Sequence, residues 1–294
     1  MEGSVFYMDR QIIVLTADKR QEKLLELLEG DKISYAWEES VSKSAVCEKI
    51  YVLPIPVTKL DKNTRLKEKL KQELINMSLR EAVSLKVFGG VFDGEWQTFL
   101  DEYQIPYWDF MKLPEVVEGN GWITAEATIA EVLQLGERSI YGQKILVTGY
   151  GCCGEKIAKL FARLGANVTV VARREEVRNI AKKDGFLAIG FEELPKTLVD
   201  ISTVINTVPA LVLTEDAIRR MPQNSLIIDI ASKPGGTDFE AAKRYGVTAK
   251  LALGLPGIYT TTSSAMLLKN AISKYAPLQE NISEDKSWIF QIVI

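Results

Sequence analysis

Short apolar runs alternate with amphipathic segments along most of the chain, which is the pattern that strands and helices give in an α/β protein. In the first third, each apolar run ends at prolines, glycines or polar turn residues. The predicted strands are 11–15, 49–53 and 85–88, and the predicted helices include 65–75 and 95–103. These elements predict a small parallel sheet covered by helices.

A second alternation of strands and helices starts at Lys144 and continues to about residue 255. Between the two regions, residues 124–135 carry apolar side chains on one face and polar ones on the other, which predicts a bridging helix. The pattern therefore predicts an α/β fold of two Rossmann-like, doubly wound lobes joined by this helix. We expect a flavodoxin-like, substrate-side domain over residues 1–118 and a second domain over residues 119–294, which includes the bridging helix and the C-terminal helix and tail.

The composition is that of an ordinary globular protein, with 47% hydrophobic and 26% charged residues among 294. A formal net charge of −3 gives no reason to expect a nucleic-acid partner. No apolar run approaches the roughly 20 residues that cross a bilayer, and the N-terminus lacks the layout of a secretory signal, so we expect a cytoplasmic protein without a membrane partner. Cys47, Cys152 and Cys153 form neither a disulfide framework nor a metal-ligand spacing, which predicts a reduced, metal-free chain.

The chain contains no histidine, the side chain that most often transfers protons near neutral pH. Any acid or base in this protein must therefore be another residue. The usual 2-hydroxyacid and amino-acid dehydrogenases share a two-lobe architecture but rely on a histidine, so its absence counts heavily against those activities.

A strand that ends in a glycine-rich turn gives the strongest sign of function. Residues 144–154 form a predicted strand followed by the G-x-G-x-x-G pattern at the start of a helix. Gly149 permits the tight turn, Gly151 lets the main chain approach a pyrophosphate, and Gly154 allows close helix packing. The strand 167–171 follows at the spacing of a βαβ unit, so we predict a nicotinamide-dinucleotide site rather than a purely structural turn. The residues expected beside the cofactor here are Gly149, Tyr150, Gly151, Cys152, Cys153 and Gly154.

Arg173 and Arg174 stand where an NAD-binding unit usually has an acidic residue for the ribose 2′-hydroxyl. Because arginine suits a 2′-phosphate, we predict NADP as the cofactor, with NAD as the alternative if both arginines are solvated surface charges. Cys152 and Cys153 lie at the predicted helix start, where a thiol can become reactive. Small side chains also fit a crowded phosphate turn, and hydride transfer needs no nucleophile, so we favour a structural role for both.

Polar residues follow the later strands at their carboxyl ends, where ligands bind in a doubly wound sheet. Asn206, Thr207 and Pro209 are expected to border the nicotinamide ribose, although an Asn-Thr pair can equally cap the next turn. The loop 232–238 combines a lysine, hydroxyls and two glycines, a composition suited to a carboxylate or simply to a flexible loop.

Several of these motifs together resemble one known family. The run 229–239, Asp-Ile-Ala-Ser-Lys-Pro-Gly-Gly-Thr-Asp-Phe, followed by Gly-Leu-Pro-Gly-Ile at 254–258, is similar to the A-type subunit of dipicolinate synthase from spore-forming bacteria. The glycine-rich turn, Asn-Thr-Val-Pro at 206–209 and Thr-Ala-Glu-Ala-Thr at 124–128 extend the resemblance over about 124–275. In the first lobe the resemblance is looser.

The looser match in the first lobe consists of residues 18–21 and Leu53-Pro54, whereas Thr16-Ala17 stands where two glycines are expected. The resemblance as a whole implies an NADP-dependent oxidoreductase subunit that forms dipicolinate (pyridine-2,6-dicarboxylate) from a dihydrodipicolinate-type precursor during sporulation. It also implies a flavoprotein-like partner, the B-type subunit of dipicolinate synthase, and a cytoplasmic location in the mother cell. Whether the chain also forms a homo-oligomer stays open.

A small dicarboxylate substrate is then expected between the lobes, with its ring facing the nicotinamide. Arg20 from the first lobe and Ser232, Lys233 and Thr237 from the second are the candidates for holding its two carboxylates.

Loss of a ring proton needs an acceptor, and Glu126 and Lys233 are the candidate catalytic residues, ahead of Tyr259 or water. Glu126 can equally be a first-turn glutamate that complements a helix dipole. A different class of function, a non-catalytic NADP-binding scaffold within a synthase complex, stays open from the sequence. The chain ends in a run, 288–294, that is apolar enough to pack on another surface.

Overall fold

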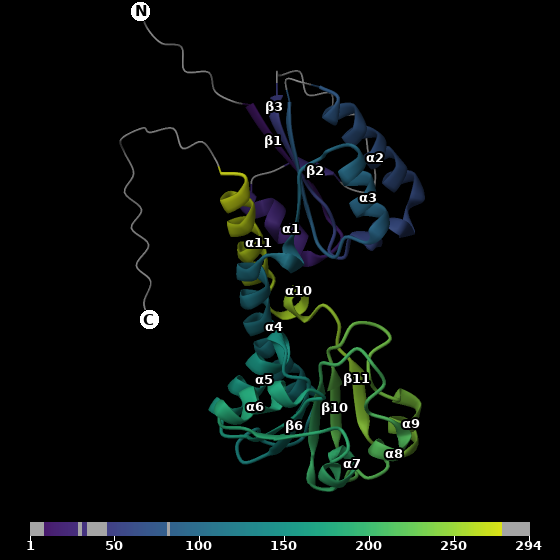
Figure 1. Cartoon of the computed structure of the whole chain (residues 1–294), viewed down its shortest axis with the longest axis vertical. Coiled ribbons are helices and arrows are strands. Elements are labelled where there is room, and N and C mark those ends of the chain that lie inside the picture. Colours follow the sequence, from purple (N-terminus) through teal and green to yellow (C-terminus); the bar gives the residue numbers. More distant parts are fainter. Residues whose placement is uncertain (1–8, 29–30, 34–45, 81–82, 278–294) are drawn as a thin grey trace, which may run out of the picture.

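The computed structural model describes residues 9–28, 31–33, 46–80 and 83–277. Within them the chain forms two α/β lobes placed end to end, each built around a parallel sheet (Figure 1). The expected fold class, two Rossmann-like doubly wound lobes with a bridging helix, is confirmed. The carboxyl ends of the strands in each sheet are turned toward the other lobe (Figure 1), so the two edges at which such sheets bind ligands face the same region.

The sheet of the first lobe has five parallel strands in the order β2-β1-β3-β4-β5, which is the flavodoxin-like order. Ile50, Tyr51 and Val52 of β3 are fully buried, as expected for a central parallel strand covered on both faces. The strands are β1 (Asp9–Leu15), β2 (Asp31–Ile33), β3 (Val46–Val52), β4 (Ser84–Gly89) and β5 (Tyr107–Asp109).

Helices cover both faces of this first sheet. Leu70 and Trp96 anchor α2 and α3 in the core on one face, and Leu24 and Leu268 anchor α1 and α11 on the other. The helices of this lobe are α1 (Lys19–Leu28), the 3-10 helix η1 (Val57–Lys62), α2 (Thr64–Ser78), α3 (Gly94–Glu102) and the 3-10 helix η2 (Phe110–Lys112).

The sheet of the second lobe has six parallel strands in the order β11-β10-β9-β6-β7-β8. This is the strand order of dinucleotide-binding Rossmann sheets, in which the chain changes direction between the first and fourth strands, here β6 and β9. The carboxyl ends of β6 and β9 therefore border the ligand crevice. The strands are β6 (Lys144–Thr148), β7 (Asn167–Val171), β8 (Leu187–Ile189), β9 (Thr203–Asn206), β10 (Leu226–Asp229) and β11 (Thr248–Leu251).

Two apolar cores cover the faces of the second sheet. Ile157 and Phe161 of α5 pack with the bridging helix on one face, and Leu194, Ala217 and Ala241 pack on the other. The helices are α5 (Cys152–Arg163), α6 (Glu175–Lys183), α7 (Leu194–Thr197), the 3-10 helix η3 (Leu198–Asp200), α8 (Glu215–Ile218), α9 (Phe239–Arg244) and α10 (Leu255–Tyr259).

The bridging helix α4 (Pro114–Leu135) starts ten residues before the start expected from the sequence. That expectation was wrong because Gly119 and Gly121 disfavour helix locally but allow close packing between helices. A methyl group at Gly119 would meet the side chain of Leu267 at 2.6 Å, and one at Gly121 would meet Cys152 Sγ at 3.0 Å. Tertiary packing thus overrides the weak local helix propensity of this stretch.

Helix α4 belongs to both lobes, because Val116 lies in a core of the first lobe and Val132 in a core of the second. The last helix, α11 (Thr261–Tyr275), packs on α1 and on α4. Although we assigned it to the second domain from the sequence, it covers the sheet of the first lobe, and the boundary at residues 118 and 119 stays a prediction. The apolar run 288–294 lies outside the described residues.

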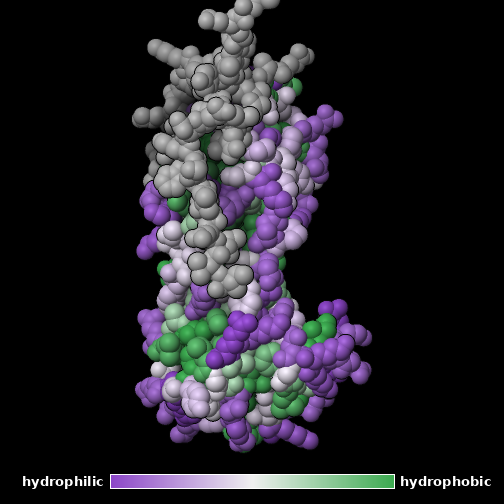
Figure 2. All heavy atoms as spheres, turned by 90° about the vertical axis from the view of Figure 1, so that its left-hand side faces the viewer, coloured by the Kyte–Doolittle hydropathy of each residue, from purple (hydrophilic) through white to green (hydrophobic). Residues whose placement is uncertain are grey.

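The surface narrows between the lobes, and hydrophobic residues gather on the face of the second lobe that Figure 2 presents. A contiguous group of exposed apolar side chains marks a candidate contact surface. Those of the second lobe include Leu133, Tyr141, Leu164, Ile180 and Leu187. None of the helices in the described ranges is both long and apolar enough to cross a membrane.

Candidate functional site

The turn between β6 and α5 has the geometry that each of its glycines was expected to serve. Gly149 adopts a φ of +84°, a conformation that favours glycine. A methyl group there would collide with Thr207 Oγ1. A methyl group at Gly154 would collide with the carbonyl oxygen of Gly149, so the start of α5 packs directly on the turn. These two contacts hold the turn against β9 and bring α5 close to the sheet.

Gly151 faces open space, because a methyl group built on it would have no atom within 4 Å. It is the N-cap residue of α5, whose first main-chain N–H groups have no partner within the helix. An N-terminus of this kind attracts phosphate through its N–H groups and the helix dipole. The turn at the β6/β9 crevice therefore fits the pyrophosphate of a dinucleotide.

The side chains within the turn point away from that open space. Tyr150 is buried and donates its hydroxyl to Asp184 Oδ2 at 2.7 Å. Only the main chain of Tyr150 is therefore available to the cofactor that we expect beside it. Cys152 donates its thiol to the carbonyl oxygen of Val117 in α4 at 3.3 Å. Burial raises the pKa of both Cys152 and Cys153 despite the opposing charge of Lys156, which keeps them as thiols and supports their structural role.

Three arginines gather at the carboxyl end of β7. Arg173 and Arg174 are exposed there, where a 2′-phosphate would lie if the cofactor is NADP. Arg178 of α6 is half-buried, and its Nη1 donates to the carbonyl oxygens of Ala172 at 3.0 Å and Arg173 at 2.8 Å. Sequence reasoning missed Arg178, although its position four residues after Arg174 places it on the same side of the helix.

A buried polar network supports the carboxyl ends of β9 and β10. Asp229 is fully buried and accepts hydrogen bonds from Asn206 Nδ2 at 2.9 Å and Thr237 Oγ1 at 2.7 Å. The main-chain N–H groups of Ala231 and Gly236 donate to the same carboxylate at 3.0 and 2.8 Å. Asn206 Oδ1 in turn accepts from the Thr148 hydroxyl of β6. Asn206 and Thr237 are therefore brought together, but inside the protein.

Several residues in the loops after β9 and β10 are exposed on the ligand edge of the sheet. Ser232 and Lys233 lie in the loop after β10, and Pro209 lies in the loop after β9. Lys233 forms no ion pair within the described part of the chain. The Thr207 hydroxyl donates to the carbonyl oxygen of Thr148 at 2.7 Å and lies beside Gly149 and the glycine-rich turn.

Glu126 is exposed on α4, the helix that bridges the two lobes. It lies in the middle of α4, so its interpretation as a first-turn glutamate was wrong. The other candidate acid–base residue, Tyr259, is hydrogen bonded to Glu131 Oε1 at 3.1 Å and Gln134 Oε1 at 2.8 Å. Glu131 is buried and also paired with Lys250 at 2.7 Å.

Charged residues of the first lobe meet at the carboxyl ends of β1 and β3. Arg20, predicted as a substrate-binding residue, is buried close to Asp18, with 3.7 Å between Arg20 Nη2 and Asp18 Oδ2. Lys59 of η1 lies 2.8 Å from the same Asp18 oxygen. The side chain of Gln21 joins the two loops, accepting from Ala17 N and donating to the Leu53 carbonyl oxygen, both at 2.9 Å. No sequence motif indicated Lys59, because it lies 41 residues from Asp18 in the sequence.

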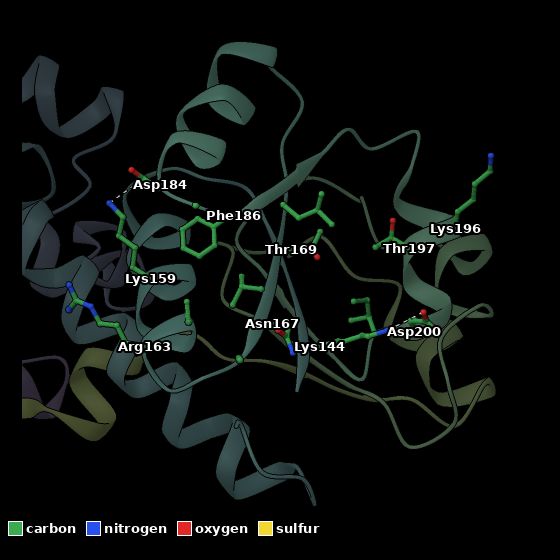
Figure 3. A pocket seen from close by; sticks show the side chains of 16 residues that line it. Lys144, Lys159, Arg163, Asn167, Thr169, Asp184, Phe186, Lys196, Thr197 and Asp200 are labelled. Atoms are coloured by element: carbon green, nitrogen blue, oxygen red, sulfur yellow. Dashed lines mark hydrogen bonds and ion pairs between the residues drawn. The ribbon is translucent and has the colours of Figure 1, made fainter. Parts of the chain in front are cut away.

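A groove of about 940 Å³ lies at the opposite, amino-terminal edge of the second sheet. Figure 3 shows Lys159 turned toward Asp184 and Lys144 toward Asp200, while Lys196 points away. These two ion pairs measure 3.0 and 3.2 Å. The groove is thus separate from the glycine-rich turn, and most of its charges are already paired.

Comparison with known proteins agrees with this geometry. Residues 122–289 match the model of the alanine dehydrogenase/PNT C-terminal domain. The A-type subunit of dipicolinate synthase from Bacillus subtilis (strain 168) is 32% identical over 205 residues, which cover 70% of this chain and 68% of that protein. The crystal structure of the corresponding dipicolinate synthase subunit from Bacillus halodurans superposes with a TM-score of 0.75 at 25% identity, covering 91% of this chain and 98% of the other.

A transhydrogenase from Sinorhizobium meliloti superposes with a TM-score of 0.60 at 15% identity, covering 90% of this chain and 94% of that one, which shows a shared fold alone. The domain match and the glycine-rich turn support a nicotinamide-nucleotide site in the second lobe without choosing between NAD and NADP. The chain therefore belongs to the family of A-type dipicolinate synthase subunits, with a second lobe of the alanine dehydrogenase/PNT C-terminal type.

Proposed function

We propose that this chain is the NADP-dependent subunit of a dipicolinate-forming enzyme, which oxidises a dihydrodipicolinate-type ring to pyridine-2,6-dicarboxylate during sporulation. The observation that carries the proposal is the open space in front of Gly151 at the β6/β9 crevice, on the edge of the second sheet that is turned toward the first lobe (Figure 1). A dinucleotide at that turn would extend its nicotinamide toward the region between the lobes.

The reaction removes two hydrogens from the ring, one as a hydride and one as a proton, and both products must be accounted for. When bound, NADP supplies the acceptor for the hydride. The chain would then hold the ring in place and receive the proton. Arg20 on the first lobe and Lys233 with Ser232 on the second are the side chains that we assign to the two carboxylates of the ring.

Lys233 is also our choice for the proton acceptor, acting as a neutral amine whose lone pair takes the ring proton while its N–H groups donate to the carboxylate. It is exposed on the ligand edge after β10, with Glu126 of α4 as the alternative acceptor, whereas the Tyr259 hydroxyl is already hydrogen bonded to the Glu131 and Gln134 side chains. We assign Asn206 and Thr237 a supporting role, because both are buried and bonded to Asp229. They would keep the loops around the nicotinamide in place rather than contact the substrate.

The partner is proposed from the relatives. Both dipicolinate synthase relatives are named as one lettered subunit of that enzyme, which implies a second one. We propose that the present chain works in the same way, with a flavoprotein-like partner, the B-type subunit, in the cytoplasm of the mother cell. NADP rather than NAD is favoured by Arg173 and Arg174, which replace the usual acidic residue at the end of β7.

The test is spectrophotometric turnover with NADP and freshly generated dihydrodipicolinate precursor, with the chain alone and then with the B-type subunit. We expect NADPH and dipicolinate absorbance to rise in equal amounts. Lys233→Ala should lower the rate roughly a hundredfold, within the range for loss of a positioned acid–base group, and leave NADP affinity unchanged. Lys196→Ala, an exposed lysine at the opposite edge of the sheet, is the matched control and should retain full activity.

If the complete mixture forms dipicolinate without reducing NADP, hydride transfer by this chain is wrong and the non-catalytic NADP-binding scaffold takes its place. The scaffold also becomes the better account if Lys233→Ala leaves the activity of the complex intact while NADP still binds.

A further inference from the structure

The first sheet has its own topological switch point, separate from the glycine-rich turn, at which sheets of this kind bind ligands. In the order β2-β1-β3-β4-β5, the chain reverses its direction of winding between β1 and β3. Ligands of open α/β sheets bind outside the carboxyl ends of the strands at such a point. Here those ends lead into residues 16–18 and 53–59. Helix α10 borders the same place, because a methyl group on Gly257 would lie 3.8 Å from Arg20 Cβ.

Within the part of the chain that the structure describes, Arg20 is a buried cation without a full set of hydrogen-bond partners. The residue is 8% exposed, and its Nε has no hydrogen-bond partner among the described residues. Its ion pair with Asp18 is long, at 3.7 Å. Burial lowers the pKa of Arg20 while Asp18 raises it, and a guanidinium nevertheless stays charged at physiological pH. A buried charge with an unsatisfied donor is costly, so the crevice is electrostatically incomplete without an anion.

Lys59 provides a second cation at the same carboxylate. Its Nζ lies 2.8 Å from Asp18 Oδ2, and its side chain is 29% exposed. The other oxygen, Asp18 Oδ1, accepts from Gln21 N at 3.1 Å and so caps α1. Burial raises the pKa of Asp18, but the hydrogen bond from Lys59 and the charge of Arg20 outweigh it, so its pKa lies below the usual value and the group is ionised. Two cations and one carboxylate leave one net positive charge.

We propose that Arg20 and Lys59 bind one carboxylate of the substrate, and that Asp18 is an internal competitor for the same two cations. The proposal rests on the proposed function for the identity of the dicarboxylate. In the ligand-free chain Asp18 is paired with Lys59. A substrate carboxylate would give Arg20 an additional hydrogen-bond acceptor, and it would either share Lys59 with Asp18 or displace Asp18 from it. One net positive charge matches a single carboxylate, so the second carboxylate of the ring is left for Lys233 and Ser232.

The competition predicts effects of opposite sign for two neighbouring substitutions. Lys59→Met removes one cation and should weaken carboxylate binding roughly tenfold, the range for a hydrogen bond to a charged group. Asp18→Asn keeps an oxygen to cap α1 but frees both cations, so carboxylate binding should tighten roughly threefold, as expected for a partly exposed ion pair. A purely structural Asp18–Lys59 pair predicts instead that both substitutions weaken binding together.

The experiment is calorimetric titration of the full-length chain, saturated with NADP, with pyridine-2,6-dicarboxylate. Wild type, Lys59→Met and Asp18→Asn are compared with Lys62→Met, an exposed lysine three residues further along η1, which should behave as wild type. NADP affinity and melting temperature are measured for each variant, so that a folding defect is recognised. Benzene-1,3-dicarboxylate serves as a second probe with the same carboxylate spacing.

The outcomes separate this proposal from the proposed function. Weaker binding in Lys59→Met with tighter binding in Asp18→Asn supports it. Equal weakening in both variants, or no change in either while dipicolinate still binds, overturns the competition and leaves the proposed function standing. If only benzene-1,3-dicarboxylate binds, with the opposite signs retained, the carboxylate site stands and dipicolinate formation falls. If neither probe binds, the site is wrong.

Discussion

The two lobes contain two sheets of the same kind, each with a crevice where the winding reverses, but they build those crevices from different parts of the chain. In the second lobe, the proposed binding surface consists of main-chain atoms of a continuous turn, Gly149–Gly154, and the start of α5. In the first lobe, the proposed surface consists of charged side chains from two loops, in which Lys59 donates to Asp18, 41 residues away in the sequence. Sheets of one type can therefore present main-chain donors at one edge and paired side-chain charges at the edge that faces it.

The two designs should respond differently to substitution. A crevice made of main chain fails when atoms are added to it or when its support is removed, because its shape is the binding determinant. A crevice made of partly exposed charges should change in graded steps, as the proposed roles of Asp18 and Lys59 require.

The largest expected effect is on the support of the second crevice. Asp229→Ala should lower the free energy of unfolding by about 4 kcal/mol, because four buried donors lose their acceptor at once. Denaturant unfolding measures this loss directly. Asp200→Ala, whose side chain is 73% exposed in the same lobe, is the control and should change stability by less than about 0.5 kcal/mol. A small loss in Asp229→Ala would mean that the network does not support the crevice.

The next effect is on the cradle itself. Gly151→Asp should weaken NADP binding by at least roughly a hundredfold, equal to about 3 kcal/mol, because it puts a negative side chain into the open space in front of the turn. Fluorescence titration with NADPH measures it. Gly94→Asp, at another open glycine at the start of a helix, should bind NADPH as wild type. Binding that survives in Gly151→Asp would separate the turn from the cofactor site.

The contrast also explains what the sequence predicted well. The turn at Gly149–Gly154 is local, so its pattern appears within a few consecutive residues, and the structure has it as expected. The first half of α4 was not predicted because it contains Gly119 and Gly121. The close packing that requires these glycines involves Leu267 and Cys152, which belong to other helices. Lys59 was missed for a similar reason.

Side chains at the carboxyl ends of strands show the same limit of prediction from the sequence. Asn206 was expected to border the nicotinamide ribose and Thr237 to hold a substrate carboxylate, but nothing in the sequence shows that both side chains would bond to the buried Asp229. Which side chain faces a ligand and which faces the core depends on partners that are distant in sequence.

A smaller effect tests the place where the second crevice does use side chains. Replacing Arg173 and Arg174 together by alanine should weaken NADP binding roughly tenfold to thirtyfold and leave NAD binding unchanged, because charge-assisted bonds to a 2′-phosphate are lost. Parallel titrations with both cofactors give the ratio. Replacing Lys182 and Lys183, exposed at the far end of α6, removes the same charge and should preserve the preference. Equal weakening for NAD and NADP, or a wild type that prefers NAD, would contradict the assignment of NADP.

The smallest expected effect concerns Tyr150, the side chain within the glycine-rich turn that is turned inward. Tyr150→Phe removes the hydrogen bond to Asp184 but keeps the ring against Phe186, so the melting temperature should fall by about 2–4 °C. The pKa of Asp184, which that hydrogen bond and Lys159 hold below its usual value, should rise, and an NMR titration follows it. Because a lowered carboxylate pKa stabilises the fold above the unfolded pKa and stops doing so as the pH falls through the folded one, the two melting temperatures should converge in acid. NADP affinity should stay within about twofold of wild type, since the cradle is main chain; a larger loss would show that the second crevice depends on its side chains after all.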